Sequence, residues 1–211
     1  MIIVIQPHNA GEYQKLMEQM FRLRARVFRD RLGWDVQVAD GKERDKYDDE
    51  APVYLIYTDD KALDVKGCLR LLPTTGPTVL ADFFSDTLPD AVCLSAPSIW
   101  ECTRFCVDER LLAKSNQDMY FASAVLIAAL GDVAMKAGIE SFLGNFDSTM
   151  LRIYRRIGCE VEVLGSTERY GTPIYLGLFP VSQTILRKVK GIPRNGQALR
   201  RRSMQEELLV A

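Results

Sequence analysis

The sequence predicts a single α/β domain, a three-layer sandwich in which helices flank a mixed, mostly antiparallel central sheet. The chain has 211 residues, of which 47% are apolar and 26% are charged, and this balance is typical of one compact globular domain. Runs of strand-forming residues come first, and strands alternate with helix-spaced segments afterwards. No internal repeat and no interdomain linker is evident in the chain. A meander followed by a β-α-β unit, covered by helices, gives such a sandwich.

The first half of the chain supplies the meander. Ile2 to Ile5 is a short β-branched run, and apolar residues recur at helical spacing from Ala10 to Phe28, which predicts a strand and then a long helix. Further strands are predicted over 52–58, 65–72 and 99–107. Residues 35–50 hold seven acids and few apolar anchors, which indicates a loop, and loops often carry functional residues.

The second half alternates helices and strands. Residues 119–137 are apolar nearly all round, which predicts a helix buried in the middle of the domain. The spacing of the remaining residues predicts a strand over 141–146, a helix over 148–157, strands over 159–164 and 173–179, and a final helix over 183–190.

Charge is unevenly distributed along the chain. Residues 1–186 carry 26 acids against 20 bases, whereas residues 187–202 carry seven bases and no acid. A basic tail of this kind could bind nucleic acid, but it has no interleaved aromatic residues. A solvated surface, or a contact for an acidic partner protein, is the favoured interpretation, and we expect no nucleic-acid partner.

Several classes of protein are disfavoured by composition. No apolar run approaches the ~20 residues of a membrane span, and the N-terminus lacks the basic region of a signal peptide, so we expect a soluble, cytoplasmic protein without a membrane span. Five cysteines without a C-x-x-C pair suit reduced thiols, and we expect no metal. The single histidine, His8, disfavours a catalytic triad.

Four segments of the chain carry an unusually specific pattern. They are Arg24-x3-Phe28-x5-Trp34-Asp35-Val36, Glu43-Arg44-Asp45-x-Tyr47-Asp48, Gly67-Cys68-x-Arg70-Leu71-x-Pro73-x2-Gly76-Pro77 and Glu101-x-Thr103-Arg104-Phe105-x-Val107-Asp108. This pattern resembles the acyl-homoserine-lactone synthases, the bacterial enzymes that make quorum-sensing autoinducers. Stretches such as QMFRLRARVF and IWECTRFCVDE resemble the rhizobial branch that makes long-chain signals.

The resemblance implies a reaction and a fold. Such enzymes form an amide between the methionyl nitrogen of S-adenosylmethionine and an acyl group carried by acyl carrier protein, and then close a lactone as methylthioadenosine leaves. No cofactor is expected, because S-adenosylmethionine is a substrate. The implied fold resembles that of the GCN5-related N-acetyltransferases, with residues 1–186 as the synthase domain and 187–211 as a basic C-terminal helix and tail.

The chemistry of the reaction suggests a role for each residue of the pattern. An α-amino group with a pKa of roughly 8 is mostly protonated at neutral pH, so a base must take its proton before the nitrogen can attack. Glu101 is the first candidate for this base, and Asp45 and Asp48 would bind or orient the methionyl end. The cations expected to hold these carboxylates ionised and aligned are Arg24, Arg70 and Arg104.

An aromatic wall suits the sulfonium and the adenine of the substrate. Phe28 and Trp34 are the candidates, since a cation-π contact contributes ~0.5–2 kcal/mol. The substrate-binding set predicted for S-adenosylmethionine is completed by Asp45, Thr103, Arg104 and Phe105.

The acyl chain should lie between the 119–137 helix and the 141–146 strand. The candidate lining residues are Met119, Ala122, Val125, Leu126, Leu143, Gly144 and Phe146. In the resembling family a threonine on this strand is associated with 3-oxo chains, and Gly144 at this place removes that hydroxyl, although Asn145 could replace it. We therefore expect a long chain that is unsubstituted, hydroxylated or unsaturated rather than 3-oxo.

A basic stripe is expected on the 148–157 helix. Arg152, Arg155 and Arg156 are spaced at i, i+3 and i+4 and are candidates to dock the acidic carrier protein. Arg152 and Arg156, with Arg169, also fall where the resembling family has basic residues that dock the carrier. A solubilising helix face is an equally good interpretation of the same charges.

Two rival functions stay open at this stage. The first is a related N-acyltransferase that uses acyl-coenzyme A, although the place of its pyrophosphate loop reads Glu109 to Lys114 without a glycine. The second is a DNA-binding protein that uses the basic tail, which would leave Glu101 and Arg104 unexplained.

Overall fold

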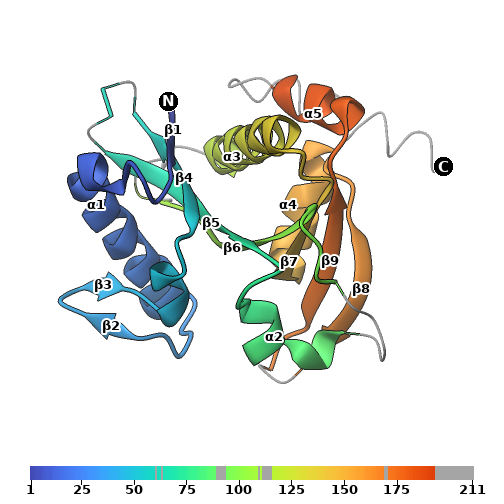
Figure 1. Ribbon diagram of the computed structural model, residues 1–211, viewed down its shortest axis with the longest axis horizontal. Helices are drawn as coiled ribbons and strands as arrows, with labels where there is room; N and C mark the ends of the chain where they lie inside the picture. The colour runs from blue at the N-terminus through green and yellow to red at the C-terminus, as the bar shows by residue number, and fades with distance from the viewer. Residues whose placement is uncertain are drawn as a thin grey trace.

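The computed structural model describes residues 1–59, 61–62, 64–88, 94–108, 110, 116–168 and 171–192, without the side chains of 116–118. One seven-stranded sheet runs through the molecule in the order β1-β4-β5-β6-β7-β9-β8 (Figure 1). Its strands are β1 (Ile2–Ile5), β4 (Val53–Thr58), β5 (Val65–Pro73), β6 (Ile99–Val107), β7 (Ser141–Asp147), β8 (Glu162–Thr167) and β9 (Ile174–Pro180). All neighbours are antiparallel except β6 and β7, which confirms the mixed sheet and its N-terminal meander.

One face of the N-terminal half of the sheet is covered by the first helix. A 3₁₀ turn, η1 (Ala10–Tyr13), precedes α1 (Gln14–Arg24), which continues into a π-helical segment, η2 (Ala25–Arg31). Leu16, Met20 and Leu23 recur at helical spacing and are buried in one apolar cluster with sheet residues such as Ile56 and Cys68.

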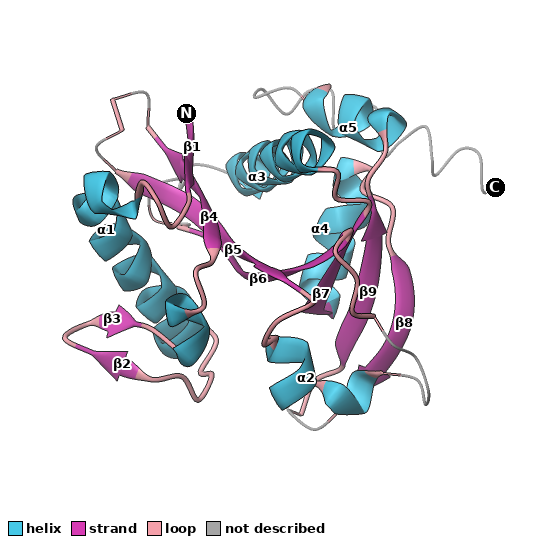
Figure 2. Cartoon of the chain, in the orientation of Figure 1, coloured by secondary structure: helices cyan, strands magenta, loops and turns pink. Residues whose placement is uncertain are grey.

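The opposite face is covered by α3 (Asn116–Ala137) and α4 (Ser148–Ile157), and α5 (Gln183–Lys190) packs on α3 (Figure 2). Leu126 on one side of α3 packs with Leu69 of the sheet, and Ala124 on another side packs with Ile153 and Ile185 of the other two helices. Residues 119–137 are long and apolar enough to cross a membrane by length and composition alone. The expectation that no apolar run approaches the length of a membrane span is corrected by this helix. Its side chains pack on two sides, against the sheet and against α4 and α5, but only 28% of the apolar window is buried, so its predicted burial is confirmed only in part.

The acidic segment is more ordered than the predicted loop. It contains a hairpin of β2 (Val38–Ala39) and β3 (Lys42–Glu43), followed by a 3₁₀ turn, η3 (Lys46–Asp49). Asp40 and Gly41 both have positive φ, 52° and 73°, as a two-residue type I′ hairpin turn requires. The expectation of a loop over 35–50 is therefore corrected at the hairpin and at η3, whereas residues 35–37 and 44–45 belong to no helix or strand.

Two short elements lie between β5 and β6 in the chain. They are α2 (Val79–Phe83), which contacts the acidic segment through Asp82 and Tyr47, and η4 (Ser85–Thr87), which packs against β8. Neither is evident from hydrophobic periodicity. Thr78 caps α2 by accepting a hydrogen bond from the Ala81 N–H at 3.1 Å.

Strands β6 and β7 separate part-way along their length. Their parallel pairing covers only Ile99–Glu101 and Ser141–Leu143, although both strands continue for several residues. Beyond this point β6 also carries a bulge opposite β5, where Arg104 has φ of 53°. The sheet therefore opens at its centre, next to the residues of the sequence pattern.

The predicted boundary between domain and tail, at residue 186, falls inside helix α5. Ile185 and Val189 of this helix are buried against α3 and α4. Residues 193–211, which hold most of the predicted tail, lie outside the described residues, as do Arg169 and most of the Glu109–Lys114 segment.

Candidate active site

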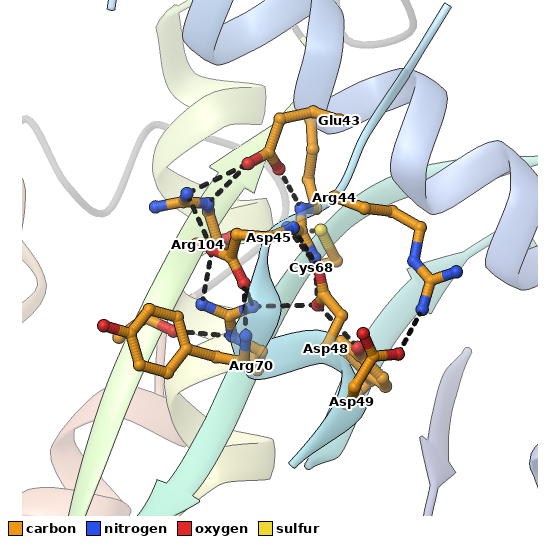
Figure 3. A network of polar contacts seen from close by, with 12 residues as sticks. Glu43, Arg44, Asp45, Asp48, Asp49, Cys68, Arg70 and Arg104 are labelled. Carbon is orange, nitrogen blue, oxygen red and sulfur yellow. Dashed lines mark hydrogen bonds and ion pairs between the residues drawn. The ribbon is translucent and has the colours of Figure 1, made fainter. Parts of the chain in front are cut away.

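Three arginines and three carboxylates form one connected network on the α1 face of the sheet (Figure 3). The arginines come from α1, β5 and β6, and the carboxylates come from the acidic segment. Its members are Arg24, Arg70, Arg104, Glu43, Asp45 and Asp48. The three positive and three negative charges balance, which makes their burial tolerable.

Arg24 is fully buried at the end of α1 and joins two acids. Its Nε donates to Glu43 at 2.5 Å, and its two terminal nitrogens donate to the two oxygens of Asp48 at 2.7 and 2.9 Å. This bidentate geometry fixes Asp48 in one orientation.

Arg70 is also fully buried and joins the two aspartates. It donates to Asp45 at 2.5 and 3.0 Å and to Asp48 at 2.8 Å, while its Nε donates to the Thr103 hydroxyl at 3.0 Å. The network is thereby connected to β6 at the start of the bulge.

Arg104 closes the network from the bulge itself. It donates to Glu43 at 2.9 and 3.1 Å and forms an ion pair with Asp45 at 2.8 Å. Its guanidinium lies 5.3 Å from the ring centroid of Phe28. A non-glycine residue with positive φ is strained, and such strain is often found at functional sites.

Asp45 and Asp48 occupy different surroundings. Asp48 is fully buried and also accepts from the Tyr54 hydroxyl at 2.6 Å and from the Asp45 backbone N–H at 2.9 Å. Burial alone would raise the pKa of Asp48, but Arg24, Arg70 and Tyr54 together lower it well below its usual value. Asp45 keeps 18% of its side chain exposed, so it is the aspartate of this pair that a ligand can reach.

The aromatic pair lies at the edge of the network. Phe28, in the π-helical segment, is buried, and Trp34 stacks on it with ring centroids 5.1 Å apart. Trp34 nevertheless remains 39% exposed, so one side of its ring is open to a ligand.

Glu101 lies at the point where β6 and β7 separate. It is buried, and its two oxygens accept from the backbone N–H groups of Val79 and Leu80 of α2 at 2.9 and 2.6 Å. Burial raises the pKa of Glu101 above its usual value, and these two hydrogen bonds and Arg70 only partly offset the effect. A carboxylate with a raised pKa is a stronger base than an ordinary one.

A cavity of about 310 Å³ begins at these residues and passes through the opening in the sheet. Phe28, Trp34, Glu101 and Arg104 line it on the α1 and α2 side. Apolar side chains line it beneath α3, α4 and α5, among them Ile127, Ile153, Phe179 and Leu186. The lining is thus polar at one end and apolar at the other.

The predicted lining is corrected at four positions. Met119, Gly144 and Phe146 do line the cavity. Ala122 and Leu126 instead pack in the core with Leu69, Leu143 packs with Leu80 and Leu176, and Val125 is not part of the lining. The side of α3 that faces the cavity carries Met119, Ser123, Ile127 and Leu130. An all-apolar helix gives no amphipathic signal that would distinguish these two sides.

Comparisons with known proteins agree with this geometry. Residues 8–189 match the sequence model of the autoinducer synthase family. An acyl-homoserine-lactone synthase of Rhizobium etli is 40% identical over 170 residues, which cover 80% of this chain and 79% of that protein. The chain belongs to the acyl-homoserine-lactone synthase family. It is therefore an acyltransferase, and its relative in Rhizobium agrees with the rhizobial resemblance.

Two solved structures are similar in fold to this synthase. A CoA-dependent acyl-homoserine lactone synthase, BjaI, with SAM and isopentyl-CoA, is 27% identical with a TM-score of 0.79, over 90% of this chain and 87% of that one. An aminoglycoside 6′-acetyltransferase, 11% identical with a TM-score of 0.51 over 86% and 97% of the two chains, shares the fold alone. The predicted acetyltransferase-like sandwich is confirmed.

The predicted basic stripe of the synthase lies on the surface of α4. Arg152, Arg155 and Arg156 are all exposed, and the Arg156 guanidinium lies 4.3 Å from the ring centroid of Tyr120 on α3. Arg169 lies outside the described residues.

Sequence reasoning missed two features of this synthase site. Glu43 was quoted in the pattern but given no role, although it is fully buried between Arg24 and Arg104. The spacing Glu43-x-Asp45-x-x-Asp48 beside three arginines was the available signal. The role of α2 in holding Glu101 had no such signal, because it depends on a contact between distant segments.

Proposed function

We propose that this synthase makes an N-acyl-homoserine lactone from S-adenosylmethionine and a long-chain acyl group on acyl carrier protein. The cavity carries the proposal, because one continuous space joins Trp34, Glu101 and Arg104 to an apolar interior. A polar methionyl group and an apolar acyl chain need such adjoining compartments.

S-adenosylmethionine would bind at the polar end. Phe28 and Trp34 offer an aromatic face to the sulfonium, a contact worth ~0.5–2 kcal/mol. Its binding site would be completed by Asp45, Thr103, Arg104 and Phe105. Of these, Asp45 and Arg104 keep 18% and 14% of their side chains exposed. The buried Asp48 and Glu43 would act through these residues rather than by touching the substrate.

Amide formation requires a free amine. Glu101, directly or through a water molecule, would take the ammonium proton, and the nitrogen would attack the thioester carbonyl. The C–N bond forms as the C–S bond breaks, and the carrier thiol leaves. The raised pKa of Glu101 supports this role, since it brings the base closer to the pKa of the amine.

Lactone formation needs no enzyme nucleophile. The methionyl carboxylate would attack its own γ-carbon, and the bond from that carbon to the sulfonium sulfur breaks. The negative carboxylate and the positive sulfonium become a neutral lactone and neutral methylthioadenosine. Holding the reacting atoms close together supplies most of the acceleration for such an intramolecular step.

The acyl chain would extend through the opening in the sheet. A Cβ atom on Gly144 would lie 3.3 Å from the Cys102 carbonyl oxygen, so this glycine keeps the passage free of a side chain. Asn145 donates to the Thr87 hydroxyl at 3.3 Å. Gly144 has no side chain that could donate to a 3-oxo group, and the Asn145 amide is already bonded to Thr87. This supports an acyl chain without a 3-oxo group.

Acyl carrier protein is the proposed donor because of the exposed arginines on α4. Acyl-coenzyme A is the second candidate, because BjaI, with a TM-score of 0.79, is CoA-dependent.

The cytoplasm is the proposed location. The described cysteines are free thiols, including Cys68 and Cys106 with sulfur atoms 3.4 Å apart, and such thiols suit a reducing compartment.

Glu101→Gln tests the proposed base. The variant keeps the shape of the side chain and can still accept a hydrogen bond from α2, but it cannot take a proton. Turnover should fall by roughly 10²- to 10⁴-fold, while methylthioadenosine still binds in calorimetry. Near-normal turnover would remove Glu101 from the mechanism.

A further inference from the structure

Glu101 is hydrogen-bonded to a helix that is too short to be stable on its own. Both oxygens of the carboxylate accept hydrogen bonds from the first two N–H groups of α2, at 2.9 and 2.6 Å. The helix has five residues, too few to be stable on its own, so contacts with the rest of the protein must fix it.

Two polar contacts connect α2 to the acidic segment. The Tyr47 hydroxyl donates to Asp82 of α2 at 2.6 Å, and Lys46 forms an ion pair with the same carboxylate at 2.6 Å. The Lys46 pair is on the surface, with 65% and 39% of the two side chains exposed, whereas Tyr47 is only 1% exposed. Surface pairs contribute little, so the tyrosine is the stronger constraint.

Tyr47 is itself fixed by the charged network. Its ring packs with Leu72 and Val79, and the Arg70 guanidinium lies 5.4 Å from the ring centroid. A continuous set of contacts therefore runs from Arg70 through Tyr47 and Asp82 to α2 and Glu101. None of these contacts requires Tyr47 or Asp82 to touch the substrate.

We infer that Tyr47 and Asp82 are positioning residues, whose hydrogen bond aligns the N–H groups of α2 with the Glu101 carboxylate. The inference rests on the proposed role of Glu101 as the base. Loss of the tyrosine hydroxyl should let α2 shift, weaken its hydrogen bonds to Glu101 and misplace the carboxylate.

The charged surroundings of Glu101 decide the direction of the pH effect. Arg70 of β5 favours the ionised form, whereas Asp45 next to η3 opposes it. Among the described residues, Tyr47 and Cys102 are titratable groups that also interact with Glu101. The two α2 N–H groups also favour the ionised form, so weaker bonds to them raise the pKa of Glu101 further. A base must be ionised, so the acidic limb of the kcat profile should move to higher pH.

Tyr47→Phe is the direct test, because it keeps the buried ring and removes only the hydroxyl. At neutral pH, kcat should fall roughly tenfold, less than the loss expected for removal of the base, with little change in the KM for the acyl donor. The acidic limb should move to higher pH. Asp82→Ala should behave alike, and Asp82→Asn, which keeps an acceptor for Tyr47, should restore most of the activity.

Tyr54→Phe is the matched control. It removes a hydroxyl that also donates at 2.6 Å to a carboxylate of the network, but that carboxylate is Asp48 and not part of α2. It should lower stability without moving the acidic limb. The inference would be overturned if the acidic limb of the kcat profile of Tyr47→Phe coincides with that of the wild type. It would also be overturned if that limb moves no further than the acidic limb of Tyr54→Phe.

A titration without substrate separates this inference from the proposed function. The Glu101 carboxyl, followed by carbon NMR in the unliganded full chain, should show a higher pKa in Tyr47→Phe than in the wild type. An unchanged pKa would overturn the inference even if Glu101→Gln is inactive. Near-normal turnover of Glu101→Gln would instead refute the proposed base.

Discussion

At the scale of single residues, two aspartates of one short segment have separate tasks. Asp48 receives hydrogen bonds from Arg24, Arg70 and Tyr54 and is fully buried, so it holds the network together. Asp45 shares Arg70 but remains partly exposed. The sequence identifies both as site residues through the family resemblance, but it cannot distinguish them, because burial depends on the tertiary packing of distant segments.

Asp48→Asn should destabilise the protein by roughly 3–5 kcal/mol, the usual cost of leaving a buried ion pair with one partner. The lowered pKa of Asp48 also predicts a pH effect. The ionised carboxylate stabilises the fold above its unfolded pKa of about 4, and this contribution is lost as the pH falls toward the lower folded pKa. Urea unfolding between pH 6 and pH 3 should therefore show a steeper loss of stability in the wild type than in Asp48→Asn.

Asp49→Asn is the control for this measurement. Asp49 is 77% exposed and pairs with Arg44 on the surface, so its substitution should change stability little. Equal slopes for wild type and Asp48→Asn would show that Asp48 does not stabilise the network.

At the scale of elements, α3 separates the core from the cavity. Ile127 lines the cavity, whereas Leu126, its chain neighbour, packs against the sheet. Ile127→Trp should fill part of the apolar end and shift the products toward shorter acyl chains, as measured by mass spectrometry of a mixed donor pool. Met135→Trp adds the same bulk on the exposed surface of α3 and should leave the distribution unchanged. An unaltered distribution in Ile127→Trp would place the acyl chain elsewhere.

Helix α4 carries the proposed carrier-docking charges. The double variant Arg152→Glu and Arg155→Glu should raise the KM for acyl carrier protein several-fold and reduce its salt dependence, because two favourable charges become repulsive. The KM for an acyl-coenzyme A donor should change much less. Lys15→Glu on α1, across the sheet, is the control, and it is compared with Arg152→Glu alone so that the change in charge is the same. If the kinetics with the carrier-bound donor do not change, the stripe is only a solvated surface.

At the scale of the whole molecule, periodic segments were predicted well and contact-dependent segments were not. Helix 148–157 and the final helix agree with α4 and α5 residue for residue, because each has one apolar side. The strand expected over 159–164 begins only at Glu162, within a range that lacks strong alternation. The β2–β3 hairpin was missed, although Asp40-Gly41 is a strong turn signal.

The candidate site follows the same division. Five of the six residues of the network were predicted as site residues, because their spacing matches a family pattern, whereas Glu43 was not. Their geometry could not be predicted, because the bulge at Arg104 and the separation of β6 from β7 arise from strand pairing across the sheet. Which residues of α3 face the cavity and which face the core could not be predicted either, since a helix that is apolar all round has no amphipathic pattern.

We propose that S-adenosylmethionine and a long acyl chain meet where the sheet opens. The most direct measurement incubates the purified full chain with S-adenosylmethionine and a long-chain acyl donor on either acyl carrier protein or coenzyme A. Mass spectrometry then follows lactone and methylthioadenosine. We predict both products in equal amounts, formed faster from the carrier-bound donor. Methylthioadenosine without acyl-homoserine lactone, or neither product from either donor, would show that this chain does not join S-adenosylmethionine to an acyl chain.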